Sequence, residues 1–343
     1  MPAQLSHTLF ADEALARAVG PRAEPLVRAG GGLFTFGAQG PDFFYHNQRT
    51  RPTGLRYGAL IHRRWYGSLI ANMAAVLVAE ARSSDRPVDR QARAFLLGFA
   101  THGALDRHAH PYVVCRSGWV KHDDPSTKSQ FRLHTFLERL LDVVLLQERR
   151  RETPADVDFF SRAYCGDMLP YATIKMLLKG VNATYPDARY KSRDRRRIEN
   201  AYEDSIRFYA MTDPRSPHRH SLAKQRDRAE GYRYRRMAVF HPATVPEALD
   251  VANLRHRPWP HPCEPTRVST ASYLDMFEAA LDEVVEPLAA LDEALEGRDL
   301  PSDLGDRFGN ESLNVTLDGR TCRPEASDPL PLQDLLHELS VPP

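Results

Sequence analysis

GFATHGALDRHAHP, residues 98–111, is the most informative stretch of the chain. His102, Asp106 and His110 follow one another at four-residue steps, so a helix places all three on one face, turn above turn. Imidazole nitrogens and carboxylates are ligands that zinc prefers. Because three such residues rise about 12 Å along a helix, they are too spread for one ion and suit two or three, with Asp106 as a bridge. His108 lies off this face and is predicted to be a polar surface residue.

A second pair of the same kind follows in HTFLE, residues 134–138. His134 and Glu138 are again four residues apart, within a strongly apolar segment where an unpaired buried charge is costly. Metal ligation would supply the missing partner. Either pair alone fits an ordinary hydrogen-bonding pair better than a metal site. Together, in successive helices and with His110 four residues after Asp106, the two pairs favour a metal site.

Apolar residues at three- and four-residue steps dominate the chain and predict an all-α fold, a multi-helix bundle whose facing helices project ligands inward. The expected helices are residues 55–82, 91–109 (ended by Pro111), 127–148, 155–169, 171–181, 195–210 and 269–295. We expect no strand before residue 310.

From Asp299 the sequence turns to Pro, Asp, Ser and Gly, which predicts an extended C-terminal tail, residues 299–343, after a helical domain of residues 1–298. A small hairpin around Asp318-Gly319 within residues 312–320 and a short docking helix at 329–339 are expected in this tail.

The bulk composition narrows the class of protein. With 343 residues and 42% hydrophobic residues, the chain can form one substantial core, and a net charge of +1 gives no reason to expect a stable nucleic-acid partner. The first residues lack the pattern of a secretory signal, and the most apolar stretch, residues 69–81, is too short to span a bilayer. Four scattered cysteines without a CxxC pair indicate reduced thiols, and therefore a cytoplasmic protein.

Two further segments have a biased composition. Residues 29–42 (AGGGLFTFGAQGPD) lack the glycine patterns that bind nucleotides, and we predict a tight connection whose glycines let backbones pack closely and which delivers Asp42 into a site. Residues 189–236 are rich in Arg and Tyr. A solvated helix face with a polar excursion explains them best, and a surface that attracts phosphate is the alternative.

Several blocks, in order along roughly residues 1–150, resemble the bacterial zinc-dependent phospholipase C family, whose fold is shared with the S1/P1-type nucleases. They are SHTLF at 6–10, GAQGPD at 37–42, the helix that holds His62, and the two histidine motifs described above. The resemblance implies an all-helical fold with two tight zinc ions and a third. By position, the first ion would be held by Asp42, His62, His102 and Asp106, the second by His110, His134 and Glu138, and the third by His7 with Asp106.

The sequence departs from the family pattern at one point and leaves a choice at another. In the secreted enzymes the amino group of an N-terminal Trp also holds the third zinc, and this chain has no such Trp, so we expect a weak or empty third site. His46, four residues after Asp42, is the alternative to His62, which is favoured because it belongs to a long predicted helix. Three other histidines are expected to be solvated, namely His122, His218 and His220.

This ligand set predicts hydrolysis of a phosphoric ester by metal-activated water, with Asp42 as general base by analogy with its family counterpart and a phosphoester such as a phospholipid as substrate. A nuclease or nucleotidase on the same fold is an alternative, which arginines and aromatic residues around the mouth of the cleft would favour. A non-catalytic metal-binding helical protein is the third possibility. The ligand types also admit manganese or iron, and the sequence does not indicate an oligomeric state.

Overall fold

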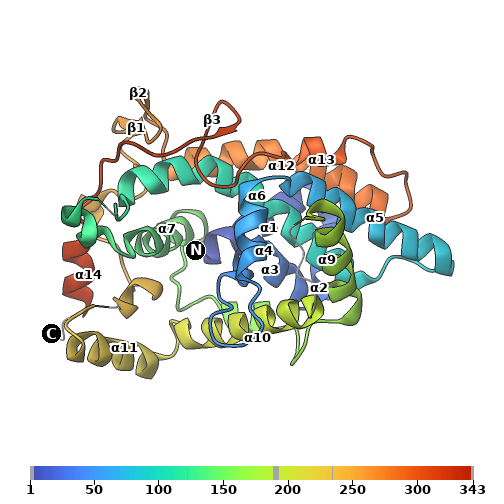
Figure 1. Ribbon diagram of the computed structural model, residues 1–343, viewed down its shortest axis with the longest axis horizontal. Helices are drawn as coiled ribbons and strands as arrows, with labels where there is room; N and C mark the ends of the chain where they lie inside the picture. The colour runs from blue at the N-terminus through green and yellow to red at the C-terminus, as the bar shows by residue number, and fades with distance from the viewer. Residues whose placement is uncertain (1–3, 122, 188–192, 234, 341–343) are drawn as a thin grey trace.

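The computed structural model describes residues 4–121, 123–187, 193–233 and 235–340. The fold is all-α, as predicted, with two small antiparallel hairpins (Figure 1). The helices are α1 Gln4–Val19, α2 Ala23–Gly30, α3 Leu33–Ala38, α4 Leu55–Arg63, α5 Tyr66–Ser84, α6 Arg90–Ser117, α7 Leu133–Arg150, α8 Phe159–Ala163, α9 Tyr171–Thr184, α10 Asp194–Thr212, α11 Pro217–Ala229, α12 Tyr273–Leu295, α13 Leu304–Arg307 and α14 Leu332–Ser340. The 3₁₀ turns are η1 Gly20–Arg22, η2 Gly40–Phe44, η3 Pro125–Gln130, η4 Arg236–Val239 and η5 Glu247–Leu249.

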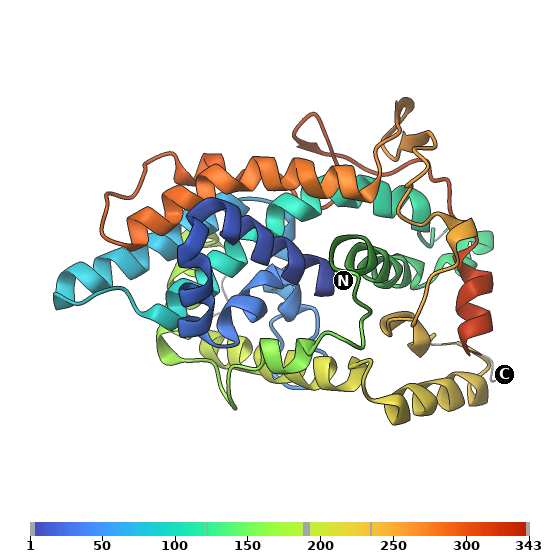
Figure 2. The ribbon, with the colours of Figure 1, turned by 180° about the vertical axis from the view of Figure 1, so that it is seen from behind.

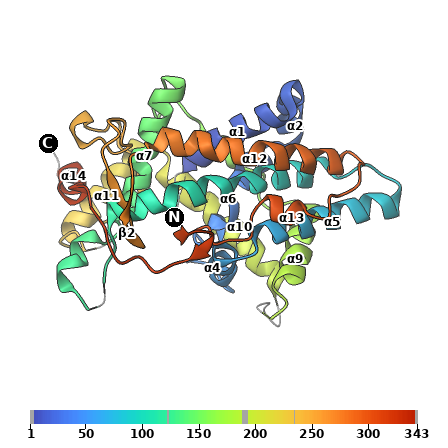
Figure 3. The same ribbon diagram turned by 90° about the horizontal axis from the view of Figure 1, so that it is seen from above.

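Helix α6 packs against both α3 and α12, and Figure 3 shows it running alongside α12. It begins where the Asp89 carboxylate accepts a hydrogen bond from Ala92 N, a standard N-cap. Its contact with α3 is backbone to backbone, because a Cβ on Gly98 would overlap the carbonyl of Phe34. Gly37, within the glycine-rich segment, approaches α6 as closely, because its added Cβ would overlap Phe95 O. The predicted close packing of this segment is therefore confirmed, although its residues 33–38 are helical.

The expected helix over residues 55–82 is wrong, because two helices, α4 and α5, occupy this range. Arg64 is extended and Trp65 has a φ of 64°, which ends α4. The apolar periodicity continues across this point, and the interruption has a tertiary cause. Trp65 N donates to Asn310 O at 2.8 Å, and Leu313 N donates to His62 O at 2.8 Å, so the C-terminal tail takes the backbone groups that a continuous helix would use.

Other helix ends also differ from the prediction. Helix α6 does not stop at Pro111 but continues to Ser117, with the proline inside it. A proline costs a helix one hydrogen bond, and packing of α6 between α3 and α12 outweighs that cost here. The helix predicted at 155–169 shrinks to α8, and residues before α12 form a hairpin of β1 Trp259–His261 and β2 Glu264–Ser269, so the expectation of no strand before 310 is wrong.

The tail runs back along the molecule from α13, past α4, to α14 (Figure 3). The hairpin predicted around Asp318-Gly319 is present as β3 Thr316–Leu317 and β4 Arg320–Thr321, and the predicted docking helix is α14. Leu313 in the tail is completely buried. The tail is therefore packed against the helices, while the domain boundary after residue 298 stays a prediction.

The expectation that all four cysteines are reduced is wrong for two of them. Cys263, after β1, and Cys322, after β4, form a disulfide that joins the two hairpins. Their separation of 59 positions along the chain carries no spacing signal that sequence could use. Cys115 and Cys165 are free thiols. The predicted cytoplasmic location loses the support that reduced thiols gave it. None of the described helices has the length and apolar character needed to cross a bilayer.

Candidate metal centre

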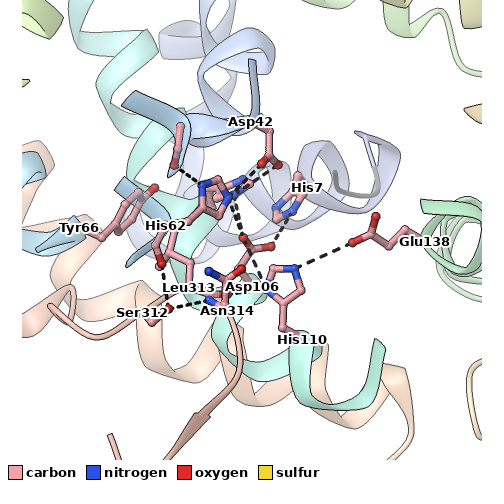
Figure 4. Close-up of polar contacts among 12 residues, drawn as sticks. His7, Asp42, His62, Tyr66, Asp106, His110, Glu138, Ser312, Leu313 and Asn314 are labelled. Carbon is pink, nitrogen blue, oxygen red and sulfur yellow. Dashed lines mark hydrogen bonds and ion pairs between the residues drawn. The ribbon is translucent and has the colours of Figure 1, made fainter. Parts of the chain in front are cut away.

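All eight residues predicted as metal ligands lie in neighbouring groups, and Figure 4 labels six of them. Five elements supply them: α1 gives His7, η2 gives Asp42, α4 gives His62, α6 gives His102, Asp106 and His110, and α7 gives His134 and Glu138. They fall into three groups, and within each group the possible ligand atoms lie within 4.8 Å of one another. The groups are His7/His102/Asp106, Asp42/His62/His102 and His110/His134/Glu138.

Asp106 is the residue on which the groups converge. Its Oδ1 lies 3.2 Å from Nε2 of His7, and its Oδ2 lies 3.0 Å from Nε2 of His102. Nε2 of His62 is 3.7 Å from the same Oδ2. Burial alone would raise the pKa of Asp106, but the neighbouring His102 and His110 outweigh burial and hold this pKa well below its usual range. Asp106 is therefore a carboxylate with both oxygens available to cations, as a bridging ligand must be.

Asp42 and His62 share a group with His102. Oδ1 of Asp42 lies 3.0 Å from Nε2 of His62, and Oδ2 lies 3.6 Å from Nε2 of His102. His46, the alternative to His62, is instead buried against Phe208, with ring centroids 4.2 Å apart. Burial lowers the pKa of His46 to about 3, so its ring is neutral. The geometry thus places His62 rather than His46 beside Asp42.

The His110 group lies across Asp106 from Asp42. Nε2 of His134 is 3.0 Å from Oε1 of Glu138, and Nε2 of His110 is 4.0 Å from the same oxygen. Glu138 is buried, whereas the His134 side chain is 31% exposed and faces the cleft. A site with three ligands and one solvent-facing side has room for water, as a catalytic rather than a structural zinc site does.

Backbone carbonyls fix three of the imidazole rings with Nε2 pointing inward. Nδ1 of His62 lies 2.8 Å from Gly58 O, and Nδ1 of His102 lies 3.3 Å from Ala38 O. His110 Nδ1 donates to Leu313 O in the tail. A hydrogen bond of this kind holds the tautomer whose Nε2 is free to bind metal. The sequence gave no sign of the Leu313 contact, because a backbone acceptor 203 residues away has no side-chain signature.

The donor set fits zinc. Oδ2 of Asp42, Oδ2 of Asp106 and Nε2 of His102 are buried, and apart from the ion-pair contacts among these three atoms none of them has a hydrogen-bond partner among the residues that the structure describes. Buried polar atoms are nearly always paired, and a cation held among these three ligand atoms would satisfy all of them. Imidazole nitrogens and carboxylate oxygens are the chemistry that zinc binds.

Five of the eight proposed ligands line an open cleft of about 330 Å³. Its lining consists of Asp42, Tyr45, Gln48, Leu55, His62, Asp106, His110, Val114, His134 and Asn314. This set includes no Lys or Arg and one aromatic residue, Tyr45, apart from the histidines. None of it comes from the Arg- and Tyr-rich segment, whose residues 189–192 and 234 lie outside the described part of the chain.

The other histidines noted in the sequence do not reach the centre. His108 Nε2 lies 2.8 Å from Oε2 of Glu283 on the surface, as predicted for a residue off the ligand face. His218 is exposed, and His220 is half-buried with its ring edge-on to Phe240. His122 lies outside the described residues.

The start of α1, the helix that carries His7, lies beside α7 (Figure 2), and a buried carboxylate on α7 holds it. Asp142 accepts hydrogen bonds from Leu5 N at 3.2 Å and from Ser6 N at 2.6 Å. Nε2 of His241 lies 2.7 Å from the same carboxylate. The first N–H groups of a helix have no partner within the helix, and Asp142 supplies one from another element. Sequence reasoning missed both Asp142 and His241.

We expect Gly40→Ala to disrupt the centre. Gly40 has a φ of +53°, which non-glycine residues rarely adopt. An added Cβ would also overlap the imidazole ring of His102, at 2.5 Å from its Cδ2. The ring of His102 has to move, so the variant should bind less zinc. Its free energy of unfolding should be about 2 kcal/mol lower than that of wild type. Gly20→Ala is the matched control, because Gly20 has a φ of +58° but nothing within 4 Å of its added Cβ. Equal zinc content of the two variants by mass spectrometry would contradict the prediction.

The all-α fold and the three neighbouring His, Asp and Glu groups define a helical protein with candidate metal-binding groups beside one cleft. The family profile of zinc dependent phospholipase C matches residues 6–173, a range that contains all eight residues. Residues 6–173 belong to the zinc-dependent phospholipase C family. No curated protein and no solved structure gives a significant match to the chain.

Proposed function

We propose that this chain is a zinc-dependent phosphoric ester hydrolase that uses a centre of two or three ions to cleave phosphodiesters, with phospholipids as the substrate class. The observation that carries the proposal is the position of Asp106. Its Oδ1 lies beside His7 and its Oδ2 lies beside His102 and His62, in a cleft that is large enough for a phosphoester. Membership of the family over residues 6–173 supports the same reaction class.

Each residue of the centre has a proposed task. Asp42, His62 and His102 with Asp106 hold the first ion, His110, His134 and Glu138 hold the second, and His7 with Asp106 holds the third. Zinc, when bound, lowers the pKa of a water molecule to about 7 and stabilises the phosphoryl oxygens. Asp42 also lines the cleft, and the pKa of its carboxyl is lowered because His102 and His62 outweigh the effect of burial. It is the proposed acceptor of the proton from the attacking water.

The composition of the cleft favours a phospholipid-type ester over a nucleic acid. Leu55 and Val114 give the cleft apolar sides, while Tyr45 is the one aromatic side chain other than histidine among the lining residues. Single-stranded nucleic acids are usually bound by stacked aromatic residues along a basic groove. The cleft lining offers neither, which counts against the nuclease alternative.

The direct test is to measure zinc per chain by mass spectrometry and hydrolysis of bis-p-nitrophenyl phosphate and phosphatidylcholine vesicles by the purified protein. We expect two or three zinc ions and turnover of both esters. Zinc without turnover of either ester would support a non-catalytic metal-binding protein, and a folded protein that binds no zinc would refute the proposed centre.

We expect zinc affinity to rise steeply between about pH 6 and about pH 8. Burial alone would lower the pKa of His7, but its hydrogen bond to Asp106 outweighs burial and raises this pKa. Burial alone would likewise lower the pKa of His62, but its hydrogen bond to Asp42 outweighs burial and raises this pKa. Because zinc binds only neutral imidazole, a raised pKa makes protons compete with zinc at and above pH 6.5. Binding should release protons, measurable by calorimetry in buffers of different ionisation enthalpy.

The folding stability of the metal-free protein should fall over the same pH range in which zinc affinity rises. A histidine whose pKa is raised by folding adds stability below its ordinary pKa of about 6.5, and this stability is lost as the pH rises through the raised value. The gain in melting temperature on adding zinc should therefore grow with pH over the same range. A gain that does not change with pH would contradict the paired His7–Asp106 and His62–Asp42 arrangement.

A further inference from the structure

The tail supplies one residue of the cleft lining, Asn314, from a part of the chain that the family profile does not reach. Ser312 Oγ donates to His62 O at 2.9 Å, and Leu313 N donates to the same carbonyl at 2.8 Å. Leu313 O in turn accepts from His110 Nδ1. These bonds tie residues 312–313 to two different ligand-bearing helices, α4 and α6, so the next residue, Asn314, has a fixed place beside the centre.

Asn314 differs from its neighbours because its side chain is directed into the cleft. Ser312, Leu313 and Val315 are buried, whereas Asn314 is exposed and lines the cleft with Asp106 and His110. Figure 4 shows the three tail residues close to His62, Asp106 and His110. The backbone N–H of Asn314 donates to Ser312 Oγ at 3.2 Å, but its side-chain amide makes no hydrogen bond with the residues that the structure describes. The fold therefore does not use this amide.

The charge of the cleft indicates what the amide can bind. A phosphoester carries negative charge, and the cleft lining contains two carboxylates, Asp42 and Asp106, and no Lys or Arg. Oxygens of the phosphoryl group that do not face the metal ions must therefore be met by neutral donors. Gln48 is a weak candidate because its Nε2 already donates to Tyr45 O at 3.1 Å. Asn314 has two amide N–H groups without such a partner.

We propose that Asn314 is a substrate-binding residue whose Nδ2 donates a hydrogen bond to a non-bridging oxygen of the phosphoryl group. This inference rests on the proposed hydrolase function. The phosphoryl group is common to phospholipids, to soluble phosphodiesters and to inorganic phosphate, so the interaction does not depend on the lipid headgroup. Asn314 contacts the substrate and leaves the metal ions to the eight ligands.

The test compares wild type with Asn314→Ala, Asn314→Asp and the control Thr321→Ala, an exposed tail residue outside the cleft lining. In Asn314→Ala we expect unchanged zinc content and melting temperature, and about tenfold weaker binding of inorganic phosphate to the zinc-loaded protein by calorimetry. The KM should rise about tenfold on bis-p-nitrophenyl phosphate and on phosphatidylcholine vesicles alike. Asn314→Asp keeps the shape but removes the donor and adds repulsion, so it should bind phosphate more weakly still.

Each other outcome overturns a specific part of the proposal. A wild-type protein that binds zinc and hydrolyses the esters, together with an Asn314→Ala variant of equal KM and phosphate affinity, would refute the role of Asn314 and leave the hydrolase function intact. Loss of a zinc ion in Asn314→Ala would make the residue a metal ligand instead. A rise in KM on vesicles alone would show headgroup rather than phosphoryl recognition. A wild-type protein without zinc or turnover would refute the hydrolase function, and this inference with it.

Discussion

Asp106→Ala should remove the one ligand that the proposed first and third zinc ions share. The variant should lose at least two zinc ions per chain and about 10³-fold or more in kcat for bis-p-nitrophenyl phosphate. The physical reason is that its two oxygens face different partners, His7 at 3.2 Å and His102 at 3.0 Å. Without the carboxylate, the clustered imidazoles lose the negative charge that favours a cation among them. Zinc by mass spectrometry and steady-state hydrolysis are the two measurements.

Glu138→Ala separates the ligand groups. This residue belongs only to the group with His110 and His134, so its loss should remove about one zinc and leave the Asp42 group loaded. Asp282→Ala is the surface control, since the Asp282 side chain is 83% exposed on α12 and belongs to none of the ligand groups. Equal zinc loss in Asp106→Ala and Glu138→Ala would mean that the ions bind as one cooperative unit. Full zinc in Asp106→Ala would show that Asp106 is not a ligand.

The local part of the site could be predicted from the sequence because helical spacing carries it. His102, Asp106 and His110 share one face of α6 at four-residue steps, and no tertiary information is needed to place them together. His134 and Glu138 follow the same rule on α7. Bringing these two helices together with His7, Asp42 and His62 needed the family resemblance, because the distances between those residues along the chain say nothing about their distances in space.

The parts that sequence reasoning missed depend on contacts between distant segments. The break between α4 and α5 follows no change in apolar periodicity, because the backbone bonds with residues 310 and 313 cause it. The continuation of α6 through Pro111 is likewise a result of packing, which local rules for proline cannot foresee. Leu313 contributes a backbone carbonyl and Asn314 a side-chain amide, and no sequence motif surrounds either residue. The same holds for the disulfide between Cys263 and Cys322.

The second large effect is expected at a residue that touches no proposed ion. Asp142 is fully buried, and its partners are two N–H groups of α1, His241 at 2.7 Å and Arg139 at 3.7 Å. Burial would raise the pKa of Asp142, but His241 and then Arg139 outweigh it and keep this pKa low. Asp142 is thus the charge that compensates the buried guanidinium of Arg139, which is 1% exposed.

Asp142→Ala should therefore lower the free energy of unfolding by about 3–5 kcal/mol, because it leaves a buried cation and two helix N–H groups without their partner. It should also lower zinc occupancy at His7, two residues beyond Ser6, while the Glu138 group stays loaded. Urea unfolding of the metal-free protein measures the first effect, and zinc content measures the second. Asp158→Ala is the matched control, since Asp158 also accepts from a helix N–H, Ser161 N at 3.0 Å, but at an exposed site. Zinc content equal to wild type would mean that the network stabilises the fold without positioning His7, and unchanged stability would refute its role altogether.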